Sequence, residues 1–190
     1  MGGPTLCPPP SHGYKEVGLK ILENFFLDYL YIMYVDHLKE YELLQGLMKR
    51  LPKVDPHSTL VLNVSPDYSS TVSMQVAHYL SDKGKMLDLF GVDVPYPGEK
   101  KDFYQRKFKR EFKGLTLKYD KLILCEAAVL SGNNYKWLKE ALYDYGYESD
   151  DIITVSLLEM ETSIFKCDFV GEYVSEMPEF YWERYNKHWD

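Results

Sequence analysis

This 190-residue chain has only three cysteines, it has no long apolar run, and its net charge is negative. Its three cysteines (Cys7, Cys125, Cys167) are far apart and form no CxxC or Cys/His ligand pattern, so we expect no structural zinc and a reducing compartment. No apolar run approaches the roughly 20 residues that span a membrane, and the first residues lack the charged and apolar regions of a signal peptide. The sequence therefore predicts a cytoplasmic protein without a membrane partner.

The net charge of −7 makes a general nucleic-acid surface unlikely. Residues 96–114 differ from the rest, because seven Lys and Arg residues stand there against three acids. Aromatic residues are interleaved with these bases. Pro95 lies just before the segment and Pro97 lies near its start, and these prolines predict a loop or a hairpin. Such a segment could close over a pyrophosphate, grip a single-stranded nucleic acid, or form a solvated hairpin whose aromatics pack on a sheet.

The order of apolar patterns predicts one α/β domain behind a helical extension. Residues 1–13 are rich in proline and glycine and are predicted to be a flexible tail, while residues 14–54 carry two helical patterns, at 18–34 and 36–51, that would form a hood. Residues 55–190 alternate between apolar strands and amphipathic helices, which predicts a mainly parallel twisted sheet with flanking helices. The predicted strands are 59–64, 85–92, 122–125 and 152–158, and the predicted helices are 70–82 and 133–145.

Residues 121–134 carry the most informative motif. An apolar strand is predicted to end at Cys125, where Glu126 follows, and Ser131-Gly132 then precedes a helical pattern. N–H groups at a helix start attract phosphate, and a carboxylate can hold ribose hydroxyls or a metal, so the pattern favours a site for a phosphorylated sugar. The alternatives are a carboxylate that only pairs at the strand end and an ordinary helix cap.

Four features in order resemble type I phosphoribosyltransferases of the hypoxanthine-guanine kind over about residues 55–190. They are the loop Ser65-Pro66-Asp67-Tyr68-Ser69 after the first strand, the strand and long polar loop after residue 85, the motif at 122–134, and the segment Lys166-Cys167-Asp168-Phe169-Val170-Gly171 with the later aromatics Phe180-Tyr181-Trp182.

The resemblance implies that the chain binds phosphoribosyl pyrophosphate (PRPP) or a nucleoside monophosphate and transfers phosphoribosyl to or from a nucleobase, with Mg²⁺ as cofactor. It implies a catalytic role for Glu126, and phosphate and ribose binding by Ser131, Gly132, Asn133 and Asn134. It further implies pyrophosphate contacts from Ser65, Asp67 and Ser69, base contacts from Lys166, Phe180 and Trp182, and a homodimer; the metal ligands stay unassigned.

Departures from the family pattern support a second hypothesis. Ala127 stands where the family has a second acid, and Leu130 stands where the purine enzymes usually have an acid–base aspartate. The first loop also lacks the family's lysine and paired glycines. The alternative is a catalytically inactive protein of the same fold that senses a nucleotide or binds a partner, with the C-terminal aromatics in the core or at an interface.

Overall fold

The computed structural model describes residues 32–64, 66–82, 85–92, 101–112 and 119–181. The predicted flexible tail at residues 1–13 lies outside the described residues, as do Ser65 and Trp182.

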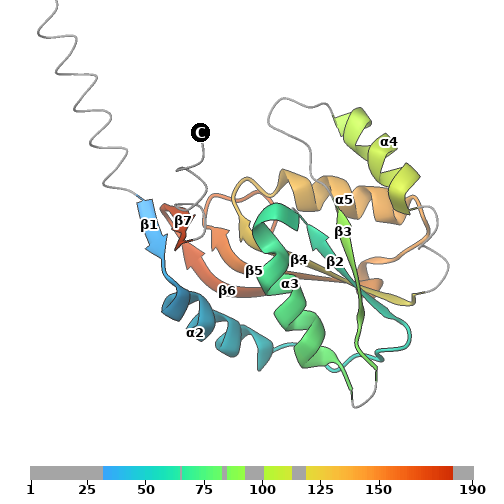
Figure 1. The fold of residues 1–190 in the computed structure, drawn as a ribbon. Helices are drawn as coiled ribbons and strands as arrows, with labels where there is room; N and C mark the ends of the chain where they lie inside the picture. Colours follow the sequence, from blue (N-terminus) through green and yellow to red (C-terminus); the bar gives the residue numbers. More distant parts are fainter. Residues whose placement is uncertain (1–31, 65, 83–84, 93–100, 113–118, 182–190) are drawn as a thin grey trace, which may run out of the picture.

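The centre of the fold is a five-stranded sheet in which all neighbouring strands are parallel, in the order β3-β2-β4-β5-β6 (Figure 1). The strands are β2 (Thr59–Val64), β3 (Asp88–Val92), β4 (Lys121–Val129), β5 (Ile152–Met160) and β6 (Phe169–Val174). Every residue of β2 is buried, as expected for a parallel strand that is covered on both faces. The predicted parallel α/β architecture is confirmed.

Two layers of helices cover the two faces of this sheet (Figure 1). On one face α2 (His37–Met48) and α3 (Pro66–Leu80) enclose a core that includes the odd-numbered Val61 of β2. On the other face α4 (Lys101–Phe112) and α5 (Asn133–Tyr143) enclose a core that includes Leu60 and Leu62. Neighbouring side chains of β2 therefore point to opposite faces of the sheet, which is the two-residue period of a β-strand.

The N-terminal extension differs from the predicted two-helix hood. The predicted second helix is confirmed as α2, and it packs against β5, β6 and α3, so it covers a sheet face. The predicted first helix is wrong at its end, because Ile32–Val35 is the strand β1, which pairs in parallel with β7 (Met177–Phe180). The rest of that predicted helix lies outside the described residues.

The basic segment is a helix over Lys101–Phe112, so the predicted loop or hairpin is wrong there. Phe108 and Phe112 are four residues apart and therefore lie on one helix face. Their rings stack at 4.9 Å between centroids, and both meet Tyr145 edge to face just beyond α5. Phe108 and Phe112, which the sequence analysis placed in a loop or hairpin, thus anchor an amphipathic helix, with Arg106 and Arg110 exposed.

Two element boundaries near the candidate site also differ from expectation. The strand predicted to end at Cys125 continues as β4 to Val129, and the helix predicted to begin at residue 70 begins at Pro66. Proline suits the first position of a helix because the N–H that it lacks has no partner within the helix there. Cys125 of β4 is buried, and burial raises the pKa of its thiol.

Candidate functional site

A tight turn joins the carboxyl end of β4 to α5, and Gly132 is its critical residue. Gly132 has φ +81°, in the left-handed region. A Cβ atom at this position would lie 2.5 Å from Ser163 Oγ and 2.6 Å from Phe165 Cβ. The N–H of Ile164 also donates to the carbonyl of Ser131 over 3.1 Å. The turn is therefore held against the segment that follows β5, and only glycine fits it.

Polar groups collect at the start of α5. The Ser131 hydroxyl accepts from the backbone N–H of Asn133 at 3.4 Å and lies 3.3 Å from its side-chain amide. Asn133 and Asn134 are partly exposed, and Lys136 in the same turn is exposed. An 11-residue helix such as α5 presents N–H groups and a positive dipole end at this point. The structure thus brings Ser131, Gly132, Asn133 and Asn134 together in a place suited to an anion.

Glu126 lies inside β4 and not at its end, which corrects the predicted position. It pairs in register with Ser156 of β5 and is only 8% exposed. Burial first, and then nearby charges that include Glu126, raise the pKa of Tyr135 well above its ordinary value. Leu122 and Leu124 of β4 belong to the core on the α5 side, so the alternation of side chains places Glu126 on that side as well.

Lys166 is held by a buried carboxylate that sequence analysis did not single out. Its Nζ lies 3.0 Å from Oε1 of Glu159, a residue with 0% exposure, and the other oxygen of Glu159 accepts from the N–H of Cys167 at 2.8 Å. The Lys166 amine also lies within 3.2 Å of the Glu161 carbonyl. An acid at the end of the apolar run of β5 was the available signal for Glu159, because a buried carboxylate needs a partner.

Asp168 fixes the start of β6 against β5 in the same segment. Its Oδ2 accepts from the backbone N–H of Thr154 at 2.8 Å and from the Thr154 hydroxyl at 2.7 Å. The backbone N–H of Asp168 donates in return to that hydroxyl at 2.9 Å. The segment that carries Lys166 is therefore anchored at both ends, by Glu159 and by Thr154.

Three of the other predicted site residues, Phe180, Asp67 and Ser69, belong to other elements. Phe180 is 4% exposed and belongs to the core on the α2–α3 face, which leaves no free ring face for the predicted base stacking. Asp67 and Ser69 fall in the first turn of α3. Across the described ranges no group of three His, Cys, Asp or Glu residues could hold a metal ion. Among the described helices, none has the length and apolar character needed to cross a membrane.

The parallel order β3-β2-β4-β5-β6, with a glycine turn between β4 and α5, defines a phosphoribosyltransferase-like fold of type I. No protein-family model matches the sequence, and no curated protein matches it either. The chain is similar to solved structures instead. Their sequence identities to this chain are low, so the similarity concerns the fold alone.

Three of these structures have a TM-score of 0.58 to this chain. A purine phosphoribosyltransferase from Pyrococcus horikoshii Ot3 is 14% identical over 80% of this chain and 93% of that one. The xanthine-guanine-hypoxanthine phosphoribosyltransferase of Helicobacter pylori is 14% identical over 82% and 95%. A hypothetical protein from Neisseria gonorrhoeae with bound ppGpp is 9% identical over 82% and 94%.

Proposed function

We propose that the turn at Ser131–Asn134 binds the phosphate of PRPP or of a nucleoside monophosphate. The observation that carries this proposal is the glycine turn in front of α5, at the carboxyl edge of a parallel sheet, where ligands of such folds bind. The helix start supplies N–H donors, and Ser131, Asn133 and Asn134 supply polar side chains. The purine phosphoribosyltransferases and the ppGpp-bound protein of similar fold support the same ligand class.

The second candidate is transfer of phosphoribosyl to or from a nucleobase, with Glu126 near the ribose and Mg²⁺ neutralising the pyrophosphate. Magnesium is held in many sites by one or two carboxylates together with the substrate's phosphates, so a single carboxylate is compatible with that role. The four sequence features that resemble the phosphoribosyltransferases, and their order along the chain, favour transfer. Against it, Leu130 offers no acid–base group and Lys166 is already paired with buried Glu159. We therefore favour nucleotide binding as the function and keep transfer as the alternative.

Thermal unfolding with PRPP, pyrophosphate and nucleoside monophosphates, each with and without Mg²⁺, tests the binding site. A ligand at 100 times its dissociation constant stabilises the native state by about 2.7 kcal/mol. Asn134→Asp places a negative charge at the proposed phosphate position and should abolish the stabilisation. Gln45→Glu adds the same charge on remote α2 and should leave it intact. A stabilisation that survives equally in both variants contradicts the assigned site.

Release of pyrophosphate distinguishes the two candidates. The protein is incubated with PRPP, Mg²⁺ and each common nucleobase, with Glu126→Gln as the control. Turnover that depends on Glu126 establishes transfer, whereas ligand binding with no product establishes the binding function. If no ligand stabilises the wild-type protein, both candidates are wrong.

A further inference from the structure

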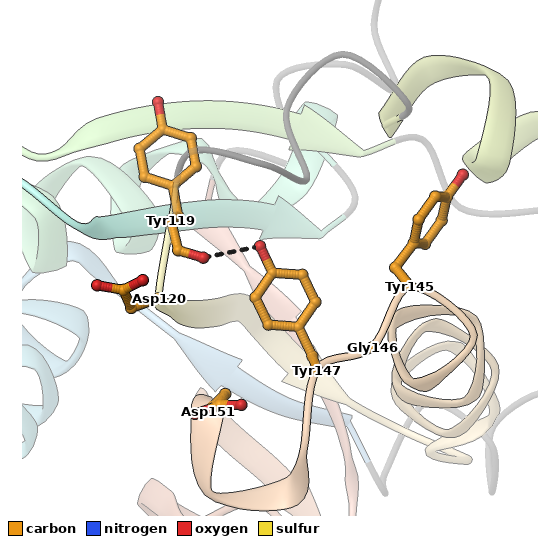
Figure 2. A pocket seen from close by; sticks show the side chains of 6 residues that line it. All are labelled: Tyr119, Asp120, Tyr145, Gly146, Tyr147 and Asp151. Carbon is orange, nitrogen blue, oxygen red and sulfur yellow. Dashed lines mark hydrogen bonds between the residues drawn. The ribbon is translucent and has the colours of Figure 1, made fainter.

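A cavity opens at the opposite end of the sheet from the turn at Ser131–Asn134, where β4 and β5 begin (Figure 2). Its volume is about 320 Å³, at the lower end of the range for small-ligand pockets. It is lined by Tyr119, Asp120, Tyr145, Gly146, Tyr147 and Asp151. The cavity is thus separated from the turn at Ser131–Asn134 by the length of β4, and it does not depend on the function proposed above.

The three tyrosines hold their rings in fixed positions, because each hydroxyl already has a partner. The Tyr119 hydroxyl donates to Asp88 at 2.7 Å, and the Tyr145 hydroxyl donates to the Lys109 carbonyl at 2.7 Å. The Tyr147 hydroxyl donates to the Tyr119 carbonyl at 3.0 Å, as the dashed line in Figure 2 shows. The cavity therefore combines rigid aromatic side chains with carboxylates, since Figure 2 shows Asp120 and Asp151 on one side of the Tyr147 ring.

Among the residues that the structure describes, the charge around this cavity is negative after the ion pairs are counted; Lys118, which precedes Tyr119, lies outside them. Three lysines each neutralise one aspartate; they are Lys85 with Asp88, Lys109 with Asp144, and Lys121 with Asp151. Three further acids have no lysine or arginine partner in the part of the chain that the structure describes; they are Asp120, Glu148 and Asp150. Burial first, and then the charges of Asp120 and Asp151, raise the pKa of Tyr147.

We propose that this cavity binds a guanidinium group, the head of an arginine side chain. A guanidinium is a planar, weakly hydrated cation that stacks on aromatic rings and bonds carboxylates through a fork of N–H donors. Half-buried Tyr119 and Tyr145 supply ring surface, whereas Tyr147 is 9% exposed and belongs to the core. Asp120 supplies an acceptor that no described lysine or arginine occupies. An ammonium matches the charge of the cavity but lacks the planar shape, so arginine is preferred over lysine.

The binding is tested by titrating the full-length protein with N-acetyl-arginine amide and following the backbone amide of Gly146 by NMR. The matched probes are N-acetyl-lysine amide, which keeps the charge, and N-acetyl-glutamine amide, which removes it. We expect the arginine probe to bind most tightly, the lysine probe more weakly, and the glutamine probe not at all. Equal binding of the arginine and glutamine probes, or no shift of Gly146 with any probe at millimolar concentration, overturns the proposal.

Two variants, each of which neutralises one aspartate, show where the arginine probe binds. Asp120→Asn should weaken the arginine probe about two- to fivefold, the range of an exposed ion pair. Asp102→Asn removes an exposed acid from the first turn of α4 and should leave the affinity unchanged. Equal effects of the two variants overturn the assignment to this cavity.

The source of the guanidinium is distinguished by comparing the capped probe with free arginine. Tighter binding of the capped form indicates an arginine within a polypeptide partner, because peptide-bonded arginine, like the probe, lacks the charged α-ammonium and α-carboxylate of the free amino acid. Tighter binding of free arginine indicates a small metabolite. Both outcomes support the cavity as a guanidinium site.

Discussion

Replacing Gly132 by alanine tests how tightly the β4–α5 turn is built. The residue has φ +81°, and a new Cβ atom would lie 2.5 Å from Ser163 Oγ, 2.6 Å from Phe165 Cβ and 2.7 Å from the Phe165 nitrogen. Two of these three atoms belong to backbone or to the base of a side chain, so they cannot move without the chain. Gly146 provides a matched control, because it has φ +92° but nothing within 4 Å of its Cβ position.

The expected cost combines two contributions. An L-residue in the left-handed region costs roughly 1–2 kcal/mol, which applies to both variants. Overpacking adds roughly 1–3 kcal/mol and applies only to Gly132→Ala. We therefore expect Gly132→Ala to lose about 2–5 kcal/mol of unfolding free energy and Gly146→Ala about 1–2 kcal/mol.

Urea unfolding measures this difference directly, and thermal unfolding checks it. For a protein of this size, 1 kcal/mol corresponds to roughly 2–4 °C in Tm, so Gly132→Ala should lower Tm by about 4–20 °C. If Gly132→Ala is no less stable than Gly146→Ala, the turn is not packed against residues 163–165. In that case the geometry on which the phosphate site depends is wrong.

Two further predictions concern the carboxylates of buried Glu40 and of Asp168, an exposed residue. Burial raises the pKa of Glu40 above its ordinary value of 4.5, which nearby His37 only partly opposes. A raised native pKa means that stability is lost as pH rises through it, so Glu40→Gln should be more stable at neutral pH and should flatten the pH profile of urea unfolding. Equal pH profiles for the wild-type protein and Glu40→Gln would contradict this role of Glu40. Asp168→Ala removes two hydrogen bonds to Thr154 and should cost about 3 kcal/mol in urea unfolding. Asp150→Ala, at an exposed aspartate, is its control, and equal stabilities would rule out the anchoring role.

The parallel sheet could be predicted from the sequence because its signal is local. Runs such as Thr59–Val64 are mostly apolar and are buried on both faces, and helical patterns separate them along the chain. Parallel neighbours require such crossovers, so alternation alone indicates the architecture. The turn at Ser131-Gly132 was predictable for the same reason, since turn and cap chemistry involve only a few consecutive residues.

One error arose where distant partners decide the local structure. Residues 32–34 looked helical by spacing, yet β1 forms because β7, about 145 residues away, lies beside it. The segment Lys101–Phe112, by contrast, does carry a helical period, because Tyr104, Phe108 and Phe112 recur every fourth residue, and the sequence analysis missed it among the many charged residues. In the structure Phe108 and Phe112 contact Tyr145 and so fix this helix on the rest of the fold.

The sequence by itself determined the kinds of residue at the carboxyl edge: an acid in an apolar strand, then Ser-Gly and two asparagines before a helix. The tertiary structure alone decided what these residues face. It placed Ser163 and Phe165 against Gly132, paired Lys166 with Glu159, and buried Phe180 in the core. The physical reason is that backbone preferences act over a few residues, whereas contacts between adjacent parallel strands join segments that are some 30 residues apart in the chain.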